Sequence, residues 1–79
     1  MPKIIAIHPM SNYLIRIGFD NGTVITLDMK HKFETMRFRE LRDKKLFCGA
    51  VTDGYCIRWN EFIEISVTEI FEMAQIDVN

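Results

Sequence analysis

The chain has 79 residues, with 10 lysines and arginines against 11 aspartates and glutamates, and an apolar content of 48%. This length allows one hydrophobic core, so we expect a single domain over residues 1–79. The apolar content excludes a disordered chain or a polar linker. The formal net charge of −1 indicates no global attraction to nucleic acid or to a membrane.

The sequence contains no signal for export or membrane insertion. No stretch approaches the ~18 consecutive apolar residues of a membrane span, and the apolar run near the N-terminus is too short for a signal peptide. Cys48 and Cys56 do not form a disulfide framework. We therefore expect reduced, half-buried thiols in a cytoplasmic protein.

The clearest local signal is a hairpin over residues 12–28, in which apolar and polar residues alternate on both sides of a turn. A two-residue Asn-Gly turn would place the apolar residues of the two strands on opposite faces. A three-residue loop, with Gly22 in the left-handed conformation, unites them on one face, and burial favours this register. It pairs Ile17 with Ile25 and Ile15 with Leu27, and we expect Tyr13 and Phe19 to share their face.

Further strands are expected before and after this hairpin. Residues 3–8 predict a strand that ends at Pro9, and residues 49–59 predict a second hairpin around an Asp-Gly turn. Alternation in the second hairpin places three apolar side chains on one face, Tyr55, Ile57 and Trp59, with Trp59 as an anchor of the core. Residues 63–65 are expected to add a short strand.

Two segments have helical signals. Residues 38–47 direct Phe38, Leu41 and Phe47 inward, and Asp43 is placed to cap a second turn, so we expect either one helix or two short pieces. Ser66 and Glu69 have capping-box spacing, followed by apolar residues at helical intervals: Val67, Ile70, Phe71 and Ala74. The sequence thus predicts an α+β fold, with an antiparallel sheet of five to six strands in two hairpins, a mid-chain helical segment and a C-terminal helix.

Charge is segregated along the chain. Residues 30–45 hold seven basic and three acidic residues, a net charge of +4, whereas residues 60–79 hold five acidic residues and no basic one, a net charge of −5. Such runs are most often solvated helix faces; the alternative is a contact surface within the fold, across a dimer or on another protein. The candidate partner surface comprises Lys30, Lys32, Arg37, Arg39, Arg42, Lys44, Lys45, Glu61, Glu64, Glu69 and Glu72.

Nucleic acid is a second possible partner for residues 30–45. Phosphate binding needs several cations on one face, and here Glu34, Glu40 and Asp43 are interleaved with the basic residues. This interleaving disfavours nucleic acid, so we rank a protein partner or self-association above it.

Motifs for catalysis or cofactor binding are missing from the sequence. Asp28 and His31 are three residues apart, but a stable metal site needs three or four ligands, and no others are evident. The four glycines are scattered rather than gathered into a phosphate-binding loop. We therefore expect no enzyme activity, no cofactor, no metal ion and no small-molecule substrate.

The order of the expected elements resembles a family of small bacterial proteins, the domain of unknown function 2442. The resemblance covers nearly all of residues 3–73 and is carried by Phe19, Gly22, Leu41, Arg42, Asp43, Phe47, Trp59, Ile65, Ile70 and Phe71. Many members follow the tryptophan with Pro-Asn-Gly-Ala-Asp, whereas this chain has Asn-Glu-Phe-Ile-Glu at residues 60–64. A ligand site shared at that turn would therefore be altered here.

The resemblance implies a non-enzymatic regulatory or interaction module, because the family has no established activity. Some members carry an added helix-turn-helix domain, and some are encoded beside a second small protein in arrangements that resemble toxin–antitoxin pairs. Since this chain ends at Asn79, we expect no DNA-reading domain. The expected function is a cytoplasmic protein-interaction module, with an antitoxin-like role as one form of it.

Overall fold

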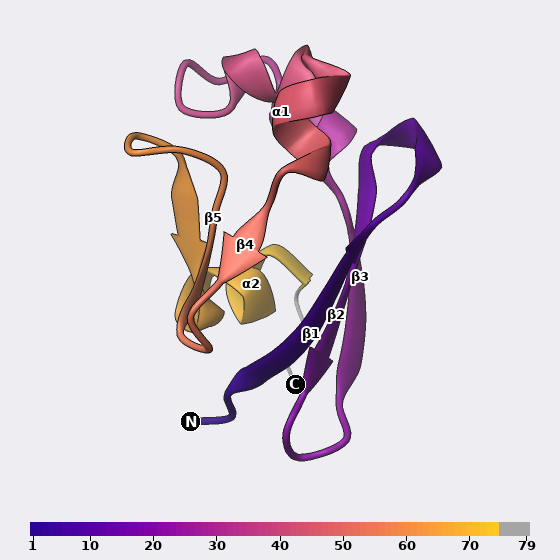
Figure 1. Cartoon of the computed structure of the whole chain (residues 1–79), viewed down its shortest axis with the longest axis vertical. Helices are drawn as coiled ribbons and strands as arrows, with labels where there is room; N and C mark the ends of the chain where they lie inside the picture. The colour runs from indigo at the N-terminus through magenta and orange to yellow at the C-terminus, as the bar shows by residue number, and fades with distance from the viewer. Residues whose placement is uncertain (75–79) are drawn as a thin grey trace.

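The computed structural model describes residues 1–74, which form two three-stranded antiparallel sheets with short helical segments between and after them (Figure 1). The first sheet has the strand order β1 (Ile4–Pro9), β2 (Leu14–Phe19), β3 (Val24–Asp28), and the second has β4 (Val51–Thr52), β5 (Cys56–Arg58), β6 (Glu64–Ser66). The helical segments are the 3-10 turns η1 (Ser11–Tyr13), η2 (Met29–Lys32) and η3 (Arg39–Arg42) and the helices α1 (Lys44–Cys48) and α2 (Val67–Ala74). The predicted α+β class and the six strands are confirmed, and the strands are divided between two sheets.

The first hairpin has the register predicted from burial. Ile17 pairs with Ile25 and Ile15 with Leu27, and all four side chains are buried. Gly22 closes the three-residue loop with φ +89°, and its N–H donates to the Phe19 carbonyl. A Cβ on Gly22 would meet no atom within 4 Å, so the backbone conformation alone favours glycine there.

The second hairpin agrees with the prediction except at Tyr55. Thr52 pairs with Ile57 across the turn, and Ile57 and Trp59 are buried as expected. Tyr55 belongs to the turn rather than to β5, and its side chain is 60% exposed. Alternation failed here because Asp53 accepts backbone hydrogen bonds from Tyr55 and Cys56, which curls the chain before the strand begins.

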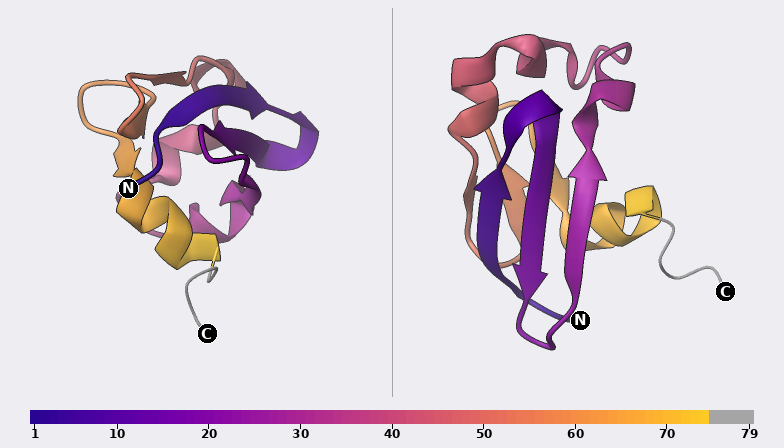
Figure 2. Two further views of the ribbon diagram at one scale, coloured as in Figure 1. Left: turned by 90° about the horizontal axis from the view of Figure 1, so that it is seen from below. Right: turned by 90° about the vertical axis from the view of Figure 1, so that its right-hand side faces the viewer.

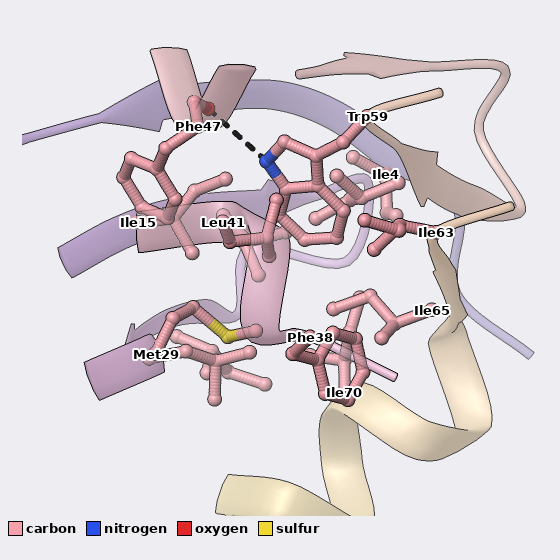
Figure 3. Packing of buried hydrophobic residues seen from close by; sticks show 14 of the residues in the cluster. Ile4, Ile15, Met29, Phe38, Leu41, Phe47, Trp59, Ile63, Ile65 and Ile70 are labelled. Atoms are coloured by element: carbon pink, nitrogen blue, oxygen red, sulfur yellow. Dashed lines mark hydrogen bonds between the residues drawn. The ribbon is translucent and has the colours of Figure 1, made fainter. Parts of the chain in front are cut away.

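The two sheets share one apolar core. Ile4 N–H donates to the Gly54 carbonyl at 2.9 Å, which ties β1 to the turn between β4 and β5. Side chains from both sheets and from the segments between them fill the interior (Figure 3). Trp59 is 6% exposed, and its indole Nε1 donates to the Phe47 carbonyl at 3.0 Å. Trp59 is therefore the predicted core anchor, and its polar atom is satisfied.

The mid-chain segment forms two short pieces, the second of the two predicted alternatives. η3 ends where Asp43 adopts an extended conformation, and the Asp43 carboxylate accepts a hydrogen bond from Lys45 N–H at 3.0 Å to start α1. Phe38, Leu41 and Phe47 are buried as expected. The pieces thus turn the chain while keeping their apolar residues against the sheets.

Helix α2 begins with the predicted capping box. Ser66 Oγ accepts from Glu69 N–H and Glu69 Oε1 accepts from Ser66 N–H, both at 3.1 Å. Val67 and Ile70 are buried, and the helix packs against β3 and crosses the open end between the sheets (Figure 2). Every helix within residues 1–74 is too short or too polar to span a bilayer.

The position of Phe47 generates a first prediction. Phe47→Ala should lower the free energy of unfolding by about 3–5 kcal/mol, since it removes a 1% exposed ring between the two sheets. Phe62→Ala is the matched control, because Phe62 is 84% exposed and its loss should change stability by less than about 0.5 kcal/mol. Urea unfolding followed by tryptophan fluorescence measures both. Equal losses in the two variants would contradict the packing described.

Candidate functional site

The basic candidate residues gather at one end of the molecule. η2, η3 and α1 lie together at the end of the sheets opposite the first hairpin turn (Figures 1 and 2). Six basic side chains on them point outward, and we call these the basic end: Lys30, Lys32, Arg39, Arg42, Lys44 and Lys45. All are exposed apart from Lys32, which is half-buried. Among the residues that the structure describes, none of the six makes a salt bridge.

The outward direction of the basic end follows from the local caps and the buried residues beside it. Asp28 accepts from Lys30 N–H and starts η2, just as Asp43 starts α1. Met29 and Leu41 are fully buried, so the remaining positions of these single turns must face solvent. The basic side chains therefore lie on short hydrogen-bonded turns, of which η2 and α1 are capped by aspartates.

Arg37 behaves differently from the other basic candidates. Its guanidinium forms a two-pronged ion pair with Glu69, with Nη1–Oε2 at 2.5 Å and Nη2–Oε1 at 2.9 Å. Nη2 also donates to the Glu64 carbonyl, and the guanidinium lies 4.8 Å from the centre of the Phe38 ring. The Glu69 carboxylate raises the pKa of Arg37, and the Arg37 guanidinium lowers the pKa of Glu69. One predicted contact between the basic and acidic segments therefore lies within the fold.

The acidic candidates do not form a second continuous surface. Glu69 is paired with Arg37, and Glu64 is paired with Arg58 at 3.0 Å, which raises the pKa of Arg58. Glu61 lies in the loop between β5 and β6, whereas Glu72 lies on α2 at the other end of the second sheet. Asp77, counted in the acidic tail, lies outside the described residues. Two of the four Glu candidates are thus committed to intramolecular pairs.

Tyr13 fastens the basic end to the first sheet, a role that the alternation pattern missed. The pattern predicted Tyr13 as a strand residue, but β2 begins at Leu14 and Tyr13 has φ +61°. Its hydroxyl donates to the Arg42 carbonyl, and its ring meets Phe33 and Phe47 edge-on at 4.9 and 5.3 Å between centroids. These contacts offset the roughly 1–2 kcal/mol that a left-handed tyrosine costs.

Two surface grooves lie near the candidate residues, one beside α1 and one beside the loop between β5 and β6. One of about 310 Å³ lies between residues 9–13 and α1, beside the exposed Cys48. The other, of about 640 Å³, lies at residues 58–61, in the turn segment that follows β5. At that turn the Asn60 carboxamide oxygen already accepts hydrogen bonds from Phe62 and Ile63 N–H. The Asn60 carboxamide oxygen therefore stabilises the turn itself.

Metal-ligating side chains are not assembled in residues 1–74. His31 Nε2 lies 3.4 Å from Asp28 Oδ2, as the three-residue spacing allows. No group of three or more His, Cys, Asp or Glu side chains in this range is placed to hold a metal ion.

Comparison with known proteins provides no relative. No family model, no curated protein and no solved structure matches the chain.

The two thiols differ in environment, which corrects the expectation that both are half-buried. Cys48 is exposed at the end of α1, and Cys56 is partly buried in β5. Burial raises the pKa of Cys56, and the nearby carboxylates of Asp53 and Glu64 raise it further.

We therefore expect iodoacetamide to alkylate Cys48 several-fold faster than Cys56 at pH 7.5, because the thiolate is the nucleophile. Mass spectrometry of timed samples measures the order, and faster labelling of Cys56 would contradict it.

The Arg37–Glu69 pair predicts a pH dependence of stability. Because the folded state lowers the pKa of Glu69, the pair stabilises the fold above the ordinary carboxyl value of 4.5, and this contribution is lost as the pH falls through the folded value. Glu69→Gln keeps the cap but removes the charge, so its unfolding free energy should fall less steeply below pH 4.5 than that of the parent. Glu72→Gln is the control on the same helix and should follow the parent. Urea unfolding at several pH values compares the three slopes, and parallel curves for all three would exclude the effect.

Proposed function

We propose that this protein is a non-enzymatic, cytoplasmic interaction module whose basic end binds an acidic surface on a protein partner. The observation that supports this most directly is the arrangement of six basic side chains on three adjoining short turns without an ion pair among the described residues. A charge surface of this kind accelerates encounter with a complementary surface and sets its orientation.

The contrast between Arg37 and the basic end supports a binding role for the basic end rather than a merely solvated face. Arg37 bonds to the Glu69 carboxylate and the Glu64 carbonyl, whereas its six basic neighbours in the same segment make no salt bridge within residues 1–74. Arg37 thus contributes to the stability of the fold. The other basic residues of the segment remain on the surface of the basic end, which buried residues of the same turns hold in place.

The composition of the same surface favours protein over nucleic acid. Glu34 and Glu40 are exposed within the segment that carries the basic end. A phosphate backbone repels such carboxylates, whereas a protein surface can offer cations to match them. The order of strands and helices, on which the proposed kinship with the domain of unknown function 2442 rests, is compatible with a regulatory role such as that of an antitoxin.

Charge reversal at the basic end tests this function. A tagged chain purified from its native cells at low salt should retain a specific acidic partner, identified by mass spectrometry. Arg39→Glu combined with Lys45→Glu should abolish that retention. The control is Lys3→Glu combined with Arg16→Glu, which makes the same charge change at exposed residues outside the basic end and should retain the partner.

The partner and the salt response decide the outcome. Retention of one acidic protein that elutes as salt is raised, and is lost in the basic-end variant only, would support the proposal. Retention of nucleic acid instead, or equal retention by both double variants, would overturn it. Circular dichroism of the variants checks that the fold persists.

A further inference from the structure

The outer edge of β3 presents unpaired backbone groups. At the turn Phe19 N–H donates to the Thr23 carbonyl, and in an antiparallel ladder the hydrogen-bonded pairs recur at every second residue. The groups that face β2 therefore belong to Ile25 and Leu27. The N–H and C=O groups of the alternate residues point away from the sheet: Val24, Thr26 and Asp28. Within residues 1–74 no other strand pairs with this edge.

The other sheet edges are short or protected. β3 is longer than β4 and β6, packs against α2 and, within residues 1–74, has no strand paired with its outer edge. β1 has an irregular register between Ile4 and Ala6, ends in Pro9, and is bonded to Gly54 of the second sheet. β4 and β6, at the edges of the second sheet, have two and three residues. β3 runs for five residues with no proline, lysine or bulge, and the Val24 side chain is 61% exposed. Unpaired edges of this kind accept a further strand.

We propose that the β3 edge pairs with the β3 edge of a second copy of this chain, which makes a continuous six-stranded antiparallel sheet in a two-fold symmetric dimer. One register satisfies every outward group: Thr26 lies opposite Thr26 of the second copy, and Val24 lies opposite Asp28. All three outward N–H groups of each chain then donate to carbonyls of the other. Opposed threonines are also a favourable cross-strand pair.

Charge complementarity supports a second copy as the partner and antiparallel pairing of the two β3 strands. β3 runs directly into η2, which carries Lys30 and Lys32. Near its other end β3 is flanked by the hairpin turn with the exposed Asp20 and by α2 with the exposed Glu72 (Figure 2). Antiparallel pairing reverses one copy relative to the other. It therefore brings the basic start of each η2 toward the acidic turn and helix of its partner, which a parallel pairing would not do.

Light scattering on wild-type and edge variants tests the dimer. At low salt the wild-type chain should have twice its 9.3 kDa mass. Thr26→Lys should return it to the mass of one chain, because two lysines would oppose each other at the two-fold axis. Val51→Lys is the matched control, since it places the same charge on an exposed residue of β4, and it should remain a dimer. Glu72→Lys, which brings like charges together, should raise the dissociation constant of the dimer at low salt, where the repulsion is least screened.

A measurement on the unmodified chain keeps the proposal testable if Thr26→Lys does not fold. In hydrogen exchange followed by NMR, the Val24, Thr26 and Asp28 amides should be protected at high protein concentration and lose that protection on dilution. The Ile25 and Leu27 amides should stay protected at both concentrations. Monomeric wild-type protein, a dimer unaffected by Thr26→Lys, or protection of the outward amides that does not depend on concentration would each overturn the β3 dimer.

The dimer does not rest on the proposed partner of the basic end. A monomeric chain that still retained its acidic partner would overturn only the dimer. A β3 dimer that retained no partner would overturn only the proposed function.

Discussion

Phe47 is the contact on which the two halves of this fold depend. The Tyr13 ring, next to the first sheet, meets it at 5.3 Å, and the Trp59 ring, from the second sheet, stacks on it at 6.4 Å. The Trp59 indole also donates to the Phe47 carbonyl. The second sheet has strands of only two or three residues and buries too little apolar surface to be stable without packing against another element. The two sheets therefore stabilise each other by burying one shared set of core residues. Phe47 lies between them and contacts Tyr13 on one side and Trp59 on the other.

This shared core dictates the character of the chain between the sheets. The segment from Met29 to Cys48 covers one end of the core with single turns, and its buried residues are Met29, Phe33, Phe38, Leu41 and Phe47. Most of the remaining positions are exposed, and about half of them carry basic side chains, with acidic and polar ones between these. The basic end is thus held by the same contacts that close the core, including the hydrogen bond from Tyr13 to the Arg42 carbonyl. A surface positioned in this way loses little conformational entropy on binding.

Local rules account for the features that the sequence predicted correctly. The three-residue loop at Gly22 followed from burial, the break at Asp43 from its ability to cap, and the start of α2 from the spacing of Ser66 and Glu69. Each of these involves residues within a few positions of one another, where backbone geometry and side-chain type decide the outcome.

The errors arise where distant contacts or turn hydrogen bonds override alternation. Alternation predicts Tyr13 as a strand residue, yet contacts with residues 20 to 34 positions away hold it in a left-handed turn. An asparagine before it, a residue tolerant of that conformation, was the available signal. Likewise, the charge count could not show that Arg37 reaches Glu69, 32 residues away, while its basic neighbours form no salt bridge in the part of the chain that the structure describes. The sequence therefore identifies the candidate residues, but only the structure shows which of them lie together at one end of the molecule.

The two proposed surfaces share residues, and this has a thermodynamic consequence. Lys30 and Lys32 belong to the basic end, and they also follow β3 directly, where a second copy would approach. If an acidic partner and a second copy both use these charges, each must weaken the binding of the other by the same factor, since linkage between binding equilibria is reciprocal. Arg39, Arg42, Lys44 and Lys45 lie further along the chain on η3 and α1 and are not adjacent to the β3 edge in sequence. The coupling should therefore be partial, so that dimerisation would modulate binding of the partner rather than exclude it.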